Sequence, residues 1–172
     1  HQYKPMKNAY AGHLKYSFQL RPHTVADQAY IGAYQGIGVG YFNFGNPEEL
    51  GNPLAVYLFQ GGRIAQFSPR ISLNYEWNFG ASFGWKPYDE YDNPENQIIG
   101  SKVNAYLNVN LYLKWALSPK FDLMIGATGS HFSNGNTQYP NSGLNTVDCK
   151  VGLVYNFNRR ADELVQSWQR PI

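Results

Sequence analysis

Seven stretches of this chain alternate apolar and polar residues, and this two-residue period is typical of β-strands with two chemically different faces. In the clearest stretch, 71–85, side chains such as Trp77 and Phe79 share one face, while Asn74 and Glu76 share the other. In chain order the alternating stretches are 13–20, 29–45, 54–67, 71–85, 101–117, 121–133 and 145–157. The sequence therefore predicts an all-β fold of consecutive antiparallel strands.

Alternation alone leaves open which face is buried, because a soluble barrel hides its apolar face and a membrane barrel exposes it to lipid. Here the polar face is mainly Gly, Ser and Asn, and charged residues make up only 15% of the chain. Such a face suits a crowded barrel interior better than a water-exposed exterior. A strand the length of 71–85, tilted by about 40°, reaches roughly 38 Å, enough to cross an apolar band of about 25 Å. We predict an up-and-down transmembrane β-barrel.

Short and long connections alternate along the chain and give the strands a direction. The segments 68–70 and 118–120 are tight turns that contain Pro, whereas 86–100 and 134–144 are long. In bacterial outer-membrane barrels the tight turns face the periplasm and the long loops face the exterior. The stretch 121–133 therefore runs outward, and its end is expected at the outer leaflet of the bacterial outer membrane.

A chain of 172 residues fits one domain. We assign residues 1–157 to the barrel and 158–172 to a periplasmic tail or short helix. Bacterial single-chain barrels have an even number of strands with both ends in the periplasm. Because seven are countable here, we expect eight strands, the first of them before His1. Direct pairing of 13–20 with 145–157 would contradict this expectation.

The apolar face of 121–133 ends in two polar residues, His131 and Ser133. Residues two apart in a strand lie about 6.6 Å apart on one face, so the imidazole could take the hydroxyl proton and activate a serine nucleophile. A third group must fix the imidazole, and Asn145 has the matching parity on the following strand.

Two residues follow the serine that suit an oxyanion site, because Asn134 and the flexible Gly135 could offer N–H donors to a developing negative charge. The alternative interpretation is structural. A His and a Ser at a strand end near the lipid headgroups can simply be interfacial polar residues, since His-x-Ser is a weak motif.

Several other functions are disfavoured by the composition. A net charge of +2 without a run of Lys or Arg does not fit nucleic-acid binding. No metal or other cofactor is expected, because neither His13 nor His23 has a second ligand at a suitable spacing. A diffusion pore is disfavoured because a small barrel fills its lumen with side chains, here Tyr106, Tyr112, Glu76 and Lys114.

The segment HFSNGNTQYPNSGLNT, residues 131–146, resembles the signature of the outer-membrane lipid A 3-O-deacylases of PagL type. Residues 98–157 are also similar to the branch of that family with Asn at the third catalytic position, and before residue 98 the likeness is mainly one of barrel pattern. The resemblance implies an eight-stranded barrel with its site on the lipid-facing exterior. It makes His131 the base and Ser133 the nucleophile, and it places Asn134 at the oxyanion hole.

The family pattern has Glu where this chain has Asn145, and this departure leaves two functions open. The first is a cofactor-free serine esterase that hydrolyses an acyl ester of lipid A or another outer-leaflet lipid. The second is a catalytically silent barrel that acts as a structural or partner subunit of an outer-membrane protein assembly. An Asn can orient the imidazole but supplies no negative charge to stabilise the imidazolium.

Overall fold

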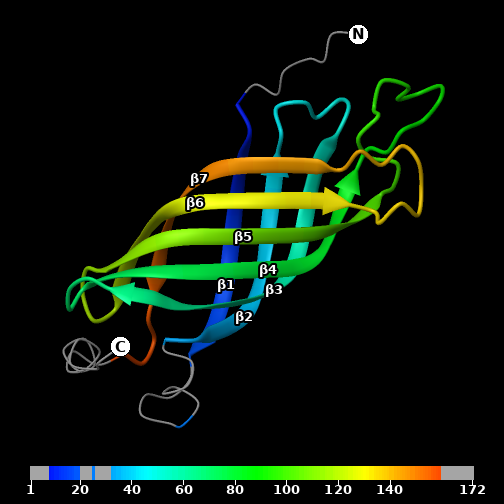
Figure 1. Cartoon of the computed structure of the whole chain (residues 1–172). Coiled ribbons are helices and arrows are strands. Elements are labelled where there is room, and N and C mark those ends of the chain that lie inside the picture. The colour runs from blue at the N-terminus through cyan, green and yellow to red at the C-terminus, as the bar shows by residue number, and fades with distance from the viewer. Residues whose placement is uncertain (1–7, 20–24, 26–31, 160–172) are drawn as a thin grey trace.

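The computed structural model describes residues 8–19, 25 and 32–159, which form one antiparallel sheet that curls into a half-barrel (Figure 1). Its strands are β1 (Tyr10–Gln19), β2 (Tyr34–Asn43), β3 (Gly51–Gln66), β4 (Ile71–Trp85), β5 (Val103–Ala116), β6 (Phe121–Ser133) and β7 (Leu144–Tyr155). Their order in the sheet is their order in the chain. The predicted all-β, up-and-down arrangement is therefore confirmed.

The strand ends differ from the predicted ranges by a few residues. The largest difference is at β2, which begins at Tyr34 although the alternating pattern starts at 29. Residues 29–31 lie outside the described part of the chain, and Gly32 forms a turn with a φ of +65°. This backbone conformation is left-handed and ends the extended pattern before Tyr34.

The apolar face of the sheet points outward. Trp77, Leu111 and Leu153 come from three different strands, and 47%, 51% and 65% of their surfaces are exposed. In a folded chain of this size, so many exposed large apolar side chains mark a surface that contacts lipid rather than water. In the described ranges, no helix is long and apolar enough to cross a membrane.

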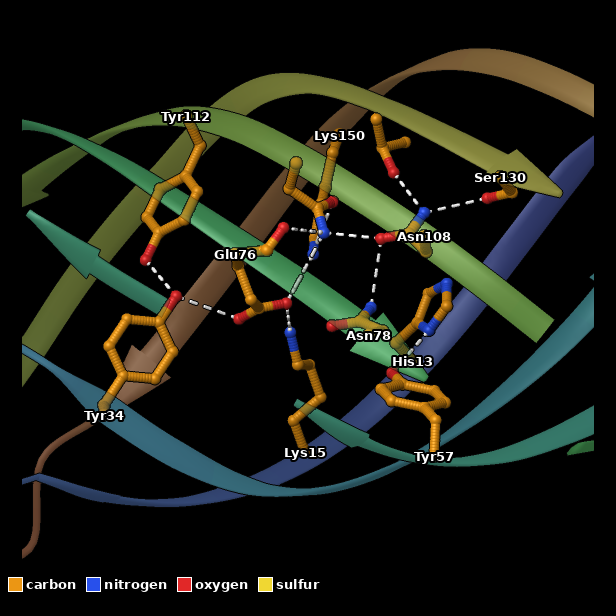
Figure 2. A network of polar contacts seen from close by, with 12 residues as sticks. His13, Lys15, Tyr34, Tyr57, Glu76, Asn78, Asn108, Tyr112, Ser130 and Lys150 are labelled. Atoms are coloured by element: carbon orange, nitrogen blue, oxygen red, sulfur yellow. Dashed lines mark hydrogen bonds and ion pairs between the residues drawn. The ribbon is translucent and has the colours of Figure 1, made fainter. Parts of the chain in front are cut away.

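The polar face lines the interior, where a hydrogen-bonded network surrounds Glu76 of β4 (Figure 2). The Glu76 carboxylate pairs with Lys15 of β1 and lies 4.0 Å from the ammonium of Lys150 of β7. Tyr34 donates a hydrogen bond of 2.9 Å to the same carboxylate, and its hydroxyl lies 2.5 Å from that of Tyr112. Strands that are distant in the sheet are thus joined through one buried acid.

Aromatic side chains fill the interior beside this network. Phe132 of β6 is fully buried, and its ring packs 5.1 Å from the rings of Phe42, Trp85 and Tyr106. A methyl group on Gly38 would lie 2.4 Å from the Tyr57 ring, so this position of β2 must lack a side chain. The lumen is therefore a packed core, as the sequence predicted from Tyr106, Tyr112 and Glu76.

Within the described residues, each ladder joins strands that are consecutive in the chain, and none joins β1 to β7. The expectation of an eighth strand before His1 stays a prediction. The expectation of a periplasmic tail or short helix at 158–172 falls mainly on residues outside the described ranges. Arg159 is described, and its guanidinium pairs with Asp122 at 2.7 Å, beside the turn 117–120.

We predict that replacing Glu76 with Gln destabilises the fold by about 2–4 kcal/mol, because it leaves the lysine charges of the lumen without their buried counterion. Urea unfolding of the protein in lipid vesicles measures this free energy. Glu90→Gln is the matched control, since it removes the same charge from an exposed loop position. Equal unfolding midpoints for the two variants would contradict the prediction.

Candidate functional site

The site begins with the register of β6 and β7, in which His131 lies directly opposite Asn145. The imidazole Nδ1 is 2.7 Å from the Asn145 amide oxygen. Because an amide oxygen can only accept, Nδ1 carries the proton and the lone pair lies on Nε2. In the neutral ring this hydrogen bond fixes the tautomer that has its lone pair on Nε2. The shared parity of the two positions predicted that the two side chains would lie together.

Ser133 ends β6 two residues beyond His131 and has the same outward parity. Both side chains are half-buried, and both lie near Gly143. A methyl group built on Gly143 would lie 3.2 Å from Cε1 of His131 and 3.9 Å from Cβ of Ser133. The two predicted side chains thus both lie near Gly143, at the end of the strand pair that adjoins the loop 134–143.

The two predicted oxyanion donors differ in their surroundings. The Asn134 N–H donates a hydrogen bond of 3.3 Å to the side-chain oxygen of Asn141, and its side-chain amide donates to the Gln138 carbonyl oxygen at 2.8 Å. Gly135 is exposed, with a φ of +64° and nothing within 4 Å of an added methyl group. The Gly135 N–H is therefore accessible, whereas the Asn134 N–H must leave Asn141 to reach a ligand.

The long connections 44–50, 86–102 and 134–143 lie at one end of the sheet (Figure 1), and two of them touch beside the site. The Ser142 hydroxyl donates a hydrogen bond of 3.0 Å to the Gln97 carbonyl oxygen. A methyl group on Gly100 would lie 2.7 Å from the Pro140 carbonyl oxygen. The connection 86–102 therefore packs closely against the loop that follows Ser133.

This supporting connection is itself held by polar contacts. The buried Asn96 side chain accepts hydrogen bonds from the N–H groups of Ile98 and Ile99 and donates to the Lys86 carbonyl oxygen at 2.8 Å. At its tip, the backbone N–H groups of Asp92 and Tyr91 lower the pKa of the Asp89 carboxyl below its ordinary value. The Asp89 carboxylate thus stabilises the turn at this tip. In the described ranges, no group of three or more possible metal ligands exists.

The strand surfaces around His131 are apolar. Its direct neighbours across β5 and β7 are Leu107 and Asn145, and the next outward position of β7 is Val147, which is 86% exposed. Asp148 follows with the opposite parity and lies opposite Thr128, so its carboxylate does not stand beside the imidazole. The site is thus a small polar patch on a surface that faces hydrocarbon.

An apolar exterior and a packed polar lumen define the class of outer-membrane β-barrels, and His131 and Asn145 form a polar patch on the outward face. Within that class, the chain belongs to the lipid A 3-O-deacylase (PagL) family, whose family model matches residues 5–154. The members of this family are outer-membrane hydrolases that act on lipid A. No curated protein and no solved structure matches the chain significantly.

Sequence reasoning predicted the contact between His131 and Asn145 and the outward parity of Ser133, but it missed the contribution of the loops. Asn141, Gly143 and Gln97 all contact the site or its support. The one sequence feature that could have pointed to these residues is the Gly two positions before Asn145. Glycine is too common in loops for this position to be recognised. Loop residues have no periodicity from which their direction can be derived.

We predict that Asn145→Ala lets the neutral His131 ring adopt both tautomers. The substitution removes the only side-chain acceptor of Nδ1–H among the described residues. Nitrogen-15 NMR of the histidine ring distinguishes the two neutral tautomers and should show Nε2–H appearing in the variant. Asn156→Ala, at the opposite end of the β7 region, is the control and should leave His131 in the Nδ1–H form. An unchanged His131 spectrum in Asn145→Ala would contradict the assignment.

Proposed function

We propose that this protein is a serine esterase that hydrolyses an acyl ester of lipid A, with Ser133 as nucleophile, His131 as general base and Asn145 as the group that orients the base. The observation that carries the proposal is the hydrogen bond of 2.7 Å between His131 Nδ1 and Asn145. It leaves Nε2 as a proton acceptor on the outward face that Ser133 shares. Membership of the lipid A deacylase family supports the choice of substrate.

The first half of the reaction transfers the acyl group to the protein. Nε2 of His131 takes the Ser133 hydroxyl proton while the serine oxygen attacks the ester carbonyl carbon. The carbonyl electron pair moves onto the oxygen, where the Gly135 N–H is the accessible donor. When this tetrahedral intermediate collapses, the lipid alkoxide leaves with the proton from His131, and an acyl-serine remains.

The second half releases the fatty acid. His131 takes a proton from a water molecule, whose oxygen attacks the acyl-serine carbonyl carbon. The second tetrahedral intermediate expels Ser133, which recovers a proton from the imidazolium. The side chains of His131, Ser133 and Asn145, the backbone N–H of Gly135 and water carry these steps. The lipid approaches the dyad from the leaflet rather than from the lumen.

Asn145 limits the rate in this mechanism. In both steps the imidazole becomes positively charged, and the amide oxygen of Asn145 supplies only a partial negative charge 2.7 Å from Nδ1. A carboxylate in the same place stabilises the imidazolium more strongly. This observation also favours a second function, in which the barrel is catalytically silent and serves as a structural or partner subunit of an outer-membrane assembly.

We expect Ser133→Ala to lower the release of hydroxy fatty acid from lipid A by at least about 10³-fold, because the nucleophile is removed. Mass spectrometry of the products formed by purified protein in detergent measures the release. The control is Ser130→Ala, which removes a hydroxyl from the inward face of the same strand. Release of hydroxy fatty acid that persists in Ser133→Ala would contradict the proposed mechanism.

We expect Asn145→Glu to raise kcat by about tenfold or more, which corresponds to about 1.4 kcal/mol of added transition-state stabilisation. Asn145→Gln is the matched control, because it has the length of Glu without the charge, and it should not raise kcat. Turnover by the wild-type chain rules out the silent barrel. Turnover by Asn145→Glu alone supports the silent barrel. If wild type, Asn145→Glu and Asn145→Gln all show no turnover, the esterase proposal is contradicted.

A further inference from the structure

Gly143 is the last loop residue before β7, and its backbone has a φ of +70°. Glycine adopts this conformation without cost, whereas other L residues are strained in it. Space is restricted as well. A methyl group at this position would lie 3.2 Å from His131 Cε1 and 3.3 Å from the Phe132 carbonyl oxygen, both closer than ordinary carbon contacts.

The direction of this contact matters for the imidazole. Cε1 lies between the two ring nitrogens, so the edge that faces Gly143 lies between the nitrogen bound to Asn145 and the nitrogen available for a proton. The same added methyl group would lie 3.9 Å from Ser133 Cβ. A side chain at 143 would therefore enter the space that His131 and Ser133 border.

Contacts of the two neighbouring residues also restrain Gly143 from moving away from an added methyl group. The preceding residue, Ser142, is tied to the Gln97 carbonyl oxygen at 3.0 Å. The following residue, Leu144, is 4% exposed and pairs with Phe132 in the β6–β7 ladder. These contacts restrain the loop on both sides, which favours a shift of the half-buried imidazole.

We infer that Gly143 is a positioning residue, which keeps open the space between the His131 imidazole and Ser133 where the reacting carbonyl must enter. The inference rests on the proposed esterase function. A reacting carbonyl carbon has to approach the nucleophile to about 3 Å with the base in reach, and a displacement of about 1 Å costs on the order of 100-fold in rate. An added methyl group at 143 forces the imidazole to shift by a few tenths of an ångström, which on this scale costs about five- to tenfold in rate.

The experiment compares Gly143→Ala with Gly84→Ala in purified protein with lipid A in detergent. Gly84 has a φ of +86° at the end of β4, and an added methyl group there would meet its nearest neighbour at 3.6 Å, an ordinary contact. Both variants strain the backbone, but only the first crowds the site. We expect kcat to fall about five- to tenfold with unchanged KM in Gly143→Ala, and to stay within about twofold of wild type in Gly84→Ala.

A third variant, Gly143→Asn, is used in case Gly143→Ala fails to fold. Asn tolerates positive φ better than Ala and adds the same Cβ atom. It should fold and lose activity like Gly143→Ala. A folded Gly143→Asn with the kcat of wild type overturns the inference, and so does an equal loss of kcat in Gly84→Ala.

An NMR measurement separates this inference from the proposed function, because it needs no turnover. The Cε1–Hε1 cross-peak of His131, assigned by its loss in His131→Gln, should shift in Gly143→Ala and remain in place in Gly84→Ala. If wild-type protein releases no fatty acid, the esterase proposal fails while this contact is still tested. An unmoved cross-peak in Gly143→Ala overturns the inference whatever the activity.

Discussion

The structure depends on one constraint, which is that successive side chains of a strand point to opposite sides of the sheet. In a bilayer the backbone must satisfy its hydrogen bonds within the sheet, and the outward side chains must be apolar. Trp77 and Leu111 meet this requirement, while Glu76 falls on the inward side by parity alone. The same parity puts His131 and Asn145 outside, so the two polar regions of the molecule have opposite surroundings.

The inward network does more than fill space. Lys15 and Lys150 come from the first and last strands of the sheet, and both reach the carboxylate of Glu76 on the middle strand (Figure 2). These ion pairs therefore stabilise the curved shape of the sheet from inside the lumen. They link β1 and β7, which no strand ladder joins in the described residues. Asn108 extends the network to β6 by donating to Thr128 at 2.6 Å and Ser130 at 2.8 Å.

The fold and the central pair of the site could be predicted because both follow from periodicity. The parity of His131 and Asn145, together with the short separation of their strands, was enough to place them side by side. The loops were not predictable in this way. The bond that occupies the Asn134 N–H comes from Asn141, and the space beside His131 depends on Gly143, whose position is set by contacts with residues 97–100 that are distant in the sequence.

The outward position of His131 and Asn145 also determines how a lipid substrate would reach them. A molecule embedded in the same leaflet reaches such a patch by sliding sideways in two dimensions, without leaving its apolar surroundings. The encounter frequency then depends on the mole fraction of that lipid in the leaflet, and the volume of the surrounding water is irrelevant. Diluting the membrane with inert lipid should therefore slow such a protein even when every other concentration is held constant.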